Sequence, residues 1–274
     1  MTFEISLTAH VVSSELLLAM KCSKPFFSIV TVTYNDLQGL RSTYESILIQ
    51  RFTNFEWLVV DGGSKDGTPD FLRSIQCPFL VWISEKDQGI YDAMNKGINM
   101  SSGDFVVFMN AGDVFSGEWV LQNIYNFVAL QNARVDIVYG GATLVLPNGK
   151  RYYRKPRVEE KYIWHGLPAN HQATYFSRKC LGEIMYDCRY RICGDYFIVA
   201  KFHKSGANPI YLDETLVDFR VGDTSHRNPR QLFWEPYVIQ RDILKMPLYS
   251  RILSLIKRAI SFTGVVIMSH RWMT

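Results

Sequence analysis

Four apolar runs, each ending in polar or acidic residues, constrain the fold of this chain most. They occupy residues 26–32, 55–60, 79–84 and 104–109, and segments with helical periodicity separate them. Strands joined by helical crossovers form a Rossmann-like, mostly parallel α/β sheet with helices on both faces. Because the carboxyl ends of parallel strands meet at one edge, we expect the polar residues that follow these runs to share a cleft.

The most informative ending follows the second run. Residues 61–68 read Asp-Gly-Gly-Ser-Lys-Asp-Gly-Thr, a loop with two carboxylates and three glycines. Ligands of open α/β sheets bind at this position. Thr68 is predicted to cap the next helix, with Pro69 in its first turn.

The composition favours a globular protein, since 47% of the residues are hydrophobic and 20% are charged. The net charge is +4, and residues 150–157 contain five positive charges. This run either forms a solvated face of the protein or attracts an anionic surface or substrate. No nucleic-acid module is recognisable, so we expect no nucleic-acid partner. Five cysteines without a Cys-x-x-Cys pair favour a reducing compartment over a disulfide scaffold or a structural zinc site.

The N-terminus does not have the pattern of a signal peptide, and no apolar stretch reaches the length of a membrane span. We therefore expect a cytoplasmic protein. Residues 259–269 are apolar but short, and basic residues precede them. They predict peripheral contact with the inner face of the cell membrane.

The chain divides into an extension, one domain and a C-terminal segment. The predicted limits are 1–24 for the extension, 25–229 for the domain, with halves 25–115 and 116–229, and 230–274 for the helical, membrane-associating segment. The second half of the domain shows different patterns. The predictions there are a hairpin around residues 147–149, a helix over 194–205, a strand over 216–221, and helices over 230–260 with breaks at Pro236 and Pro247.

Several common motifs are absent. There is no Gly-x-Gly-x-x-Gly, no phosphate-binding Gly-x-x-x-x-Gly-Lys-Ser/Thr and no Gly-x-Ser-x-Gly. Instead, the strand ends offer Asp61, Asp66, Asp87 and Asp113. Carboxylates can bind a ribose or a base, or hold Mg²⁺ or Mn²⁺, and such an ion bridges an acidic site to a diphosphate.

Taken in order, the strand-end motifs resemble family 2 glycosyltransferases, which have the GT-A fold. The motifs are residues 27–35, 59–68, 87–97 and 103–113. Within the family, the chain most resembles bacterial exopolysaccharide enzymes of the colanic-acid type. These share an Asn-x-Gly-Asp ending, here residues 110–113, and a His-Gln-Ala motif, here residues 171–173.

The resemblance implies a role for each matching residue. The nucleotide pocket would comprise Thr33, Asn35, Asp61, Asp66 and Asp87. His171 and Gln172 would shape the acceptor pocket, and Asp113 and His226 would bind the metal. Asn110 and Gly112 replace two acids of the commoner Asp-x-Asp-Asp pattern, so metal binding is expected to depend on the substrate diphosphate.

The resemblance also implies a reaction. An inverting, metal-dependent glycosyltransferase of the hexosyltransferase type would move a sugar from a nucleotide-sugar to a glycan acceptor, lipid-linked, in exopolysaccharide or capsule synthesis. Asp195, at the start of a predicted helix, would be the general base that deprotonates the acceptor hydroxyl. The helix dipole would keep it ionised, and the divalent ion would stabilise the leaving diphosphate.

Other interpretations stay open at this point. The metal motif, in which two acids are replaced, also fits a non-catalytic member of the family that binds a nucleotide or glycan in a polysaccharide assembly complex. A sugar-phosphate nucleotidylyltransferase needs a glycine-rich basic loop after the first strand, where this chain has Thr33 to Asp36. Asp195 could simply cap its helix, and Asp66 could only order its own turn. Trp164 could be core or a platform that stacks on sugars.

Overall fold

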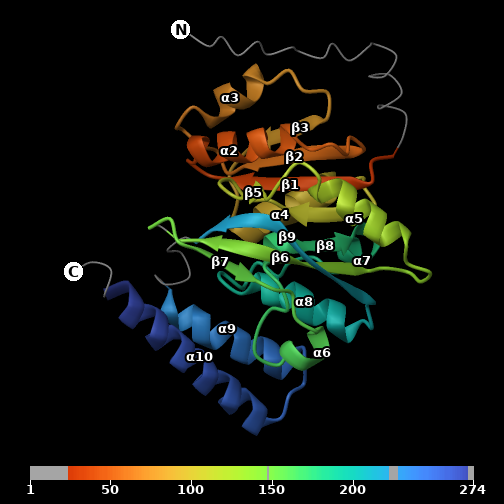
Figure 1. Ribbon diagram of the computed structural model, residues 1–274. Helices are drawn as coiled ribbons and strands as arrows, with labels where there is room; N and C mark the ends of the chain where they lie inside the picture. Colours follow the sequence, from red (N-terminus) through yellow and green to blue (C-terminus); the bar gives the residue numbers. More distant parts are fainter. Residues whose placement is uncertain (1–23, 147, 222–227, 271–274) are drawn as a thin grey trace.

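The computed structural model describes residues 24–146, 148–221 and 228–270, and only the backbone for 261–270. One sheet dominates it, with strand order β3-β2-β1-β4-β8-β6-β9-β5 and with β7 paired to β6 (Figure 1). The strands are β1 (Phe27–Thr33), β2 (Phe55–Asp61), β3 (Leu80–Ser84), β4 (Phe105–Phe108), β5 (Val114–Phe115), β6 (Ile137–Val145), β7 (Arg151–Arg154), β8 (Thr174–Ser177) and β9 (Pro209–Arg220).

Helices follow the strands along the chain. They are α2 (Leu37–Leu48), α3 (Thr68–Ser74), α4 (Ile90–Met100), α5 (Val120–Ala129), α6 (Glu159–Tyr162), α7 (Arg178–Glu183), α8 (Gly194–Lys204), α9 (Pro229–Asp242) and α10 (Leu248–His270). A short 3₁₀ turn, η1, spans His171–Ala173.

The first half of the sheet is parallel. Strand β1 lies between β2 and β4, and β3 pairs with the outer side of β2. Thr33 is in register with Asp61, and Asp61 with Ser84, so the strand ends meet at one edge as the sequence predicts. In the second half, β8 runs antiparallel to β4 and β6. The predicted fold class, a Rossmann-like α/β sheet, is confirmed.

Side chains alternate between two buried layers along each central strand, because successive strand residues point to opposite faces. Val30 and Val32 pack with α4 and α8, whereas Phe27 and Ile29 pack with α2 and α5. The sheet is therefore covered on both faces, and α9 and α10 extend the layer that contains α8 (Figure 1). No described helix has the length and apolarity that crossing a membrane requires.

Several boundaries differ from the sequence predictions. Helix α3 begins at Thr68, with Gly67 as its cap at a φ of 89°. Strands β6 and β9 are longer than predicted, because they pair with each other along their length. The predicted break at Pro236 is wrong, because α9 passes through it. A proline inside a helix costs about 3 kcal/mol, and the packing of α9 against α8 and α10 keeps the helix continuous. The break at Pro247 is confirmed. Residues 1–23 of the predicted extension lie outside the described residues.

Candidate active site

The Asp61 carboxylate connects the loop that follows β2 to the end of β3 through hydrogen bonds. It is fully buried and accepts hydrogen bonds from the backbone amide of Ser64 at 3.1 Å and from Ser84 Oγ at 2.5 Å. Ser64 Oγ also donates to it. Nearby, Thr33 Oγ1 is buried and has no hydrogen-bond partner within the described part of the chain. The strand ends therefore combine a satisfied carboxylate with an unsatisfied hydroxyl.

Asn35 and Asp66 join the loop to the start of α2. Asn35 has a positive φ of 50° and its Oδ1 accepts the amide of Lys65 at 2.9 Å. Asp66 accepts the amide of Leu37 at 2.8 Å and also bonds to Thr68. Burial raises the pKa of Asp66, but these hydrogen bonds outweigh it and leave the pKa below its ordinary value. Asp66 orders its own turn, as one interpretation of the sequence had it.

Gly62 lies at the point where three strand-end loops converge. A Cβ atom placed on Gly62 would lie 2.7 Å from the Asp87 carboxylate and 3.2 Å from the ring of Tyr34. Asp87 itself accepts the amide of Gly89 at 2.9 Å, just before α4. The structure thus brings Thr33, Asn35, Asp61, Asp66 and Asp87 to one edge of the sheet.

The turn that follows β4 carries Asp113. Thr43 of α2 fixes this turn: its buried Oγ1 donates to Asp113 O at 2.8 Å and accepts the amide of Gly112 at 3.0 Å. Gly112 has a φ of 93°, which disfavours any side chain there. Burial raises the pKa of Asp113 to about 8, although hydrogen bonds from Arg220 and Gln172 lower it in part. Gln172 therefore lies against the carboxylate.

The donor atoms of this turn suit a hard cation only in part. Asp113 supplies one carboxylate, and Asn110 Oδ1 is a buried oxygen without a hydrogen-bond partner in the described structure. Mg²⁺ and Mn²⁺ bind through such oxygens and keep positions for substrate phosphates. Among the described residues, no group of three or more His, Cys, Asp or Glu could hold a metal ion. His226 lies outside the described residues.

Asp195 occupies the second position of α8, so Cys193 rather than Asp195 is the cap of that helix. Its half-buried carboxylate accepts the amide of Tyr196 at 2.8 Å. Burial raises the pKa of Asp195 to about 6, and Tyr196, Arg154 and Arg258 limit the rise. At neutral pH the carboxylate is ionised, as a general base must be.

Contacts from α4 and α9 fix the loop that leads into α8. The Glu235 carboxylate of α9 accepts the backbone amides of Arg191 at 2.8 Å, Ile192 at 3.0 Å and Cys193 at 2.8 Å. Tyr91 of α4 donates to Ile192 O at 2.8 Å. Asp195 is thereby held against the helix that follows Asp87.

His171 is buried in the protein core rather than open to solvent. Its ring stacks on Phe108, with centroids 5.0 Å apart, and its Nε2 lies 2.6 Å from Tyr186 Oη. Burial lowers the pKa of His171 to about 4, so the ring is neutral. This environment favours a packing role for His171, whereas Gln172 reaches the candidate metal carboxylate.

Reasoning from sequence assigned no role to Tyr91, Thr43 or Glu235. Tyr91 lies inside the motif at residues 87–97, so that motif already contained the signal for it. Thr43 falls on the apolar face of α2, and Glu235 is an acid between buried positions of α9. A polar residue at an apolar helical position is the sequence signal that could have found both.

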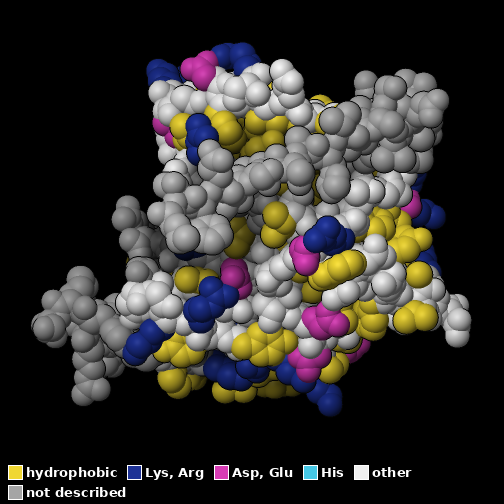
Figure 2. Space-filling view, turned by 45° about the horizontal axis from the view of Figure 1, so that its top comes forward, with side chains coloured by type: hydrophobic (Ala, Val, Ile, Leu, Met, Phe, Trp, Pro, Cys, Tyr) yellow, Lys and Arg dark blue, Asp and Glu magenta, His cyan; other side chains and the backbone are white. Residues whose placement is uncertain are grey.

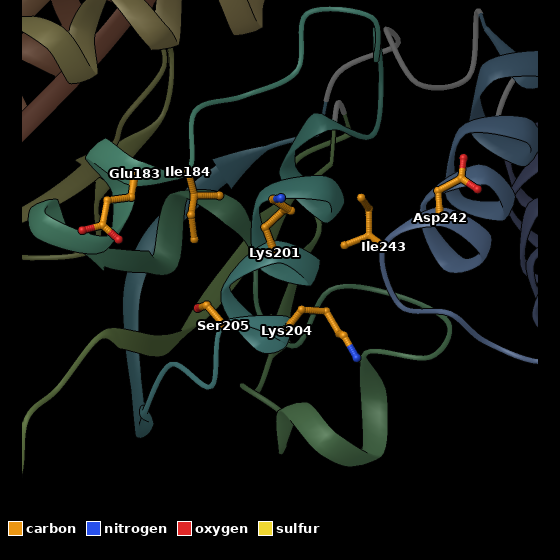
Figure 3. A pocket seen from close by; sticks show the side chains of 7 residues that line it. All are labelled: Glu183, Ile184, Lys201, Lys204, Ser205, Asp242 and Ile243. Carbon is orange, nitrogen blue, oxygen red and sulfur yellow. The ribbon is translucent and has the colours of Figure 1, made fainter.

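A pocket of about 340 Å³ lies elsewhere on the molecule (Figure 3). It is lined by Glu183, Ile184, Lys201, Lys204, Ser205, Asp242 and Ile243. The α8 residues among them follow Asp195 by six or more positions, which is about 9 Å or more along the helix. This pocket is therefore at the opposite end of α8 from the candidate base.

Comparison with known proteins gives consistent results. Residues 28–193 match the family described as glycosyl transferase family 2. A glycosyltransferase of Mycobacterium tuberculosis H37Rv is 30% identical over 214 residues, which cover 77% of this chain and 81% of the relative. A protein of Mycobacterium bovis BCG named PGL/p-HBAD biosynthesis glycosyltransferase is 31% identical and covers 63% of this chain and 67% of its own length.

Solved structures share the fold at low sequence identity. Staphylococcus aureus TarS 1–349 in complex with UDP has a TM-score of 0.63 and 16% identity, and the match covers 85% of this chain and 70% of TarS. The mannosyltransferase PcManGT of Pyrobaculum calidifontis, in complex with GDP-Man and Mn²⁺, has a TM-score of 0.64 and 16% identity over 92% of this chain and 81% of its own.

Proposed function

The chain belongs to glycosyltransferase family 2, and on that premise we propose that it is an inverting transferase of the hexosyltransferase type. It would move a sugar from a nucleoside diphosphate donor to a hydroxyl group of a glycan. The proposal rests mainly on the contact between α4, which follows Asp87, and the loop that precedes Asp195. Tyr91, four residues after Asp87, fixes the loop that presents Asp195.

The donor would lie along the strand-end edge. The unsatisfied Thr33 hydroxyl and the loop that Asp61 holds in place would form the pocket for the base and ribose. Asp87, with its carboxylate near Gly62, would face the ribose and the diphosphate. The structures of TarS with UDP and of PcManGT with GDP-Man support a nucleotide-sugar as the donor.

A divalent ion would be held by Asp113, with Asn110 and the donor diphosphate as further oxygen ligands. When bound, it would neutralise charge that develops on the leaving diphosphate. The single carboxylate and the relative solved with Mn²⁺ together support metal binding that depends on the donor. His226 stays a proposed ligand from the sequence alone.

Asp195 would remove the proton of the attacking hydroxyl. Its pKa of about 6 keeps it ionised at neutral pH yet makes it a stronger base than an ordinary aspartate. The Tyr196 amide holds the carboxylate in place, and the charge of Arg154 limits its pKa. In-line attack on the anomeric carbon would invert its configuration without a covalent intermediate.

The acceptor would be a lipid-linked glycan, handled at a membrane surface. Helix α10 supports this, because it turns its apolar side outward. Five large apolar side chains of α10 are 46–74% exposed, and their spacing of three or four residues places them on one face of the helix. They are Tyr249, Ile252, Leu253, Ile256 and Ile260. Its polar side faces the protein, where buried Ser254 accepts Gln240 Nε2 at 2.7 Å.

The positive charge of α10 favours contact between this apolar face and an anionic lipid surface. The helix contains no acidic residue, and exposed Lys257 lies one turn after Leu253, at the border of this face. Hydrophobic and basic side chains lie next to each other along the lower edge of the surface in Figure 2. Helices of this kind lie in the membrane interface. A role in exopolysaccharide or capsule synthesis is part of the same proposal.

Release of nucleotide from UDP-, GDP- and dTDP-sugars, measured with Mn²⁺ and with a glycan acceptor, tests the activity. We expect release for one nucleotide class, and loss of release in Asp195→Asn with nucleotide binding preserved. The single carboxylate of the metal turn supports a second candidate, a non-catalytic binding protein. Calorimetric nucleotide binding without turnover of any donor would favour that candidate.

A further inference from the structure

A cluster of basic and aromatic side chains lies on the loop between β7 and β8 and on the adjoining face of α10. It comprises three cations and three rings, which we call the basic platform: Arg157, Lys257, Arg258, Tyr162, Trp164 and His165. None of these residues is proposed above to contact the donor or the attacking hydroxyl, and Arg258 acts on Asp195 only through its charge.

The rings pack together and the cations lie over them. The His165 ring is 4.1 Å from that of Tyr162 and 4.3 Å from that of Trp164, between centroids. The Arg157 guanidinium lies 4.5 Å from the Tyr162 ring, and the Lys257 ammonium lies 5.0 Å from the Trp164 ring. Arg157 and Lys257 are both exposed, so the platform is open to a ligand.

Two buried polar atoms at the platform lack hydrogen-bond partners in the described structure. They are Nε of Arg258 and Nδ1 of His165, and Arg258 Nη2 donates to His165 O at 3.0 Å. Burial, together with the charges of Lys257, Arg258 and Arg157, lowers the pKa of His165 to about 4. The ring is therefore neutral and lies in a positive potential.

Two other cations of the basic run are neutralised by ion pairs. Arg151 pairs with Asp218 at 2.6 Å, and Lys155 pairs with Asp213. In contrast, Arg157 forms no ion pair within the described part of the chain, and the same holds for Arg258. These two arginines, beside unsatisfied polar atoms, supply the chemistry that binds an anion.

The platform adjoins the candidate base. Tyr196, the residue after Asp195, donates its hydroxyl to Ile163 O in the middle of the ring cluster. Arg258 also acts electrostatically on Asp195. A group bound at the platform is thus next to the acceptor hydroxyl that Asp195 would deprotonate.

We infer that the basic platform binds the phosphate or diphosphate group through which the acceptor sugar is attached to its carrier. The inference rests on the proposed transferase function and specifies its acceptor as a glycosyl phosphate. Arginine and lysine would pair with the phosphate oxygens, and the half-buried Trp164 ring would pack on the sugar. The opposite face of α10 carries the apolar residues, so a lipid carrier would leave in that direction.

Calorimetric titration with inorganic pyrophosphate tests the site, with UDP or GDP at saturation so that the donor pocket is filled. We expect the double variant Arg157→Gln/Lys257→Gln to bind pyrophosphate at least about tenfold more weakly. Lys204→Gln is the matched control, because it removes an exposed charge from the far end of α8 and should leave pyrophosphate binding within about twofold.

Equal pyrophosphate affinity in wild type and the double variant would overturn the inference. So would loss of binding to phosphatidylglycerol vesicles in the double variant with pyrophosphate affinity unchanged, since the cations would then recognise lipid headgroups. Nucleotide affinity tests the proposed function separately, because failure to bind UDP or GDP would reject the donor site. In that case the titration with pyrophosphate would still measure binding at the basic platform.

Discussion

The ring of Tyr91 packs against the Cα atom of Gly194, so that a Cβ atom on Gly194 would lie 2.7 Å from the ring. This contact joins α4, which follows the donor-side Asp87, to the first residue of α8, which precedes Asp195. The tyrosine hydroxyl adds a hydrogen bond of 2.8 Å to Ile192 O. The position of the candidate base is therefore set by the element that carries the donor motif.

Gly194→Ala should lower the rate of transfer, because the added methyl group must displace Tyr91 or the start of α8. We expect kcat to fall by about tenfold or more, since small displacements of a catalytic group are costly. Nucleotide affinity measured by calorimetry should stay within about twofold. Gly182→Ala is the control, because no atom lies within 4 Å of a Cβ atom there. Unchanged kcat in Gly194→Ala would contradict the role of this contact.

Asp195→Asn should abolish most of the transfer, with kcat lower by about a hundredfold or more. The folded-state pKa of Asp195 is raised, so the ionised carboxylate destabilises the fold above that pKa of about 6. The variant should therefore unfold at an equal or higher temperature than wild type at pH 7.5. Full activity in the variant would show that another group is the base.

The pH profile should report the same carboxylate. A base acts when deprotonated, so kcat/KM should rise with pH and level off above the pKa of about 6. Between pH 5 and pH 7 the rise should be about tenfold, whereas an aspartate of ordinary pKa would give almost none. Nucleotide binding measured at both pH values is the control for effects on the donor.

Removal of divalent ions should stop turnover. We expect EDTA to lower nucleotide release by about a hundredfold and added Mn²⁺ to restore it. Asp113→Asn should respond little to Mn²⁺, because the turn then offers only amide oxygens. Exposed Asp70→Asn is a matched control. Full activity of the wild type in EDTA would reject a metal at this turn.

Gly62→Ala should weaken nucleotide binding, because the methyl group would meet the Asp87 carboxylate at 2.7 Å. We expect a Kd about tenfold higher, which corresponds to about 1.4 kcal/mol. Gly117→Ala is the control, since a Cβ atom there has no neighbour within 4 Å. Equal affinities of the two variants would place the nucleotide away from this loop.

The outward face of α10 should control membrane binding. Leu253→Ser/Ile256→Glu should reduce co-sedimentation with phosphatidylglycerol vesicles by about tenfold or more, because two apolar side chains no longer enter the interface. Both residues are about half exposed, so the fold should tolerate the change. The control is Val81→Ser, an exposed apolar residue on β3. If the double variant instead dissociates a dimer without changing sedimentation, the face binds a second copy.

The sequence alone determined the parallel half of the sheet and its polar edge. Continuous apolar strands and helical periodicity are local patterns, and parallel pairing then brings Thr33, Asp61 and Ser84 into register. The tertiary structure decided how these groups are used. It buries Asp61 among serine donors, places His171 under Phe108, and raises the pKa of Asp195. It also turns the polar face of α10 inward. Burial, pKa and exposure depend on contacts between segments far apart in the chain, such as Tyr91 with Gly194, and no local pattern encodes them.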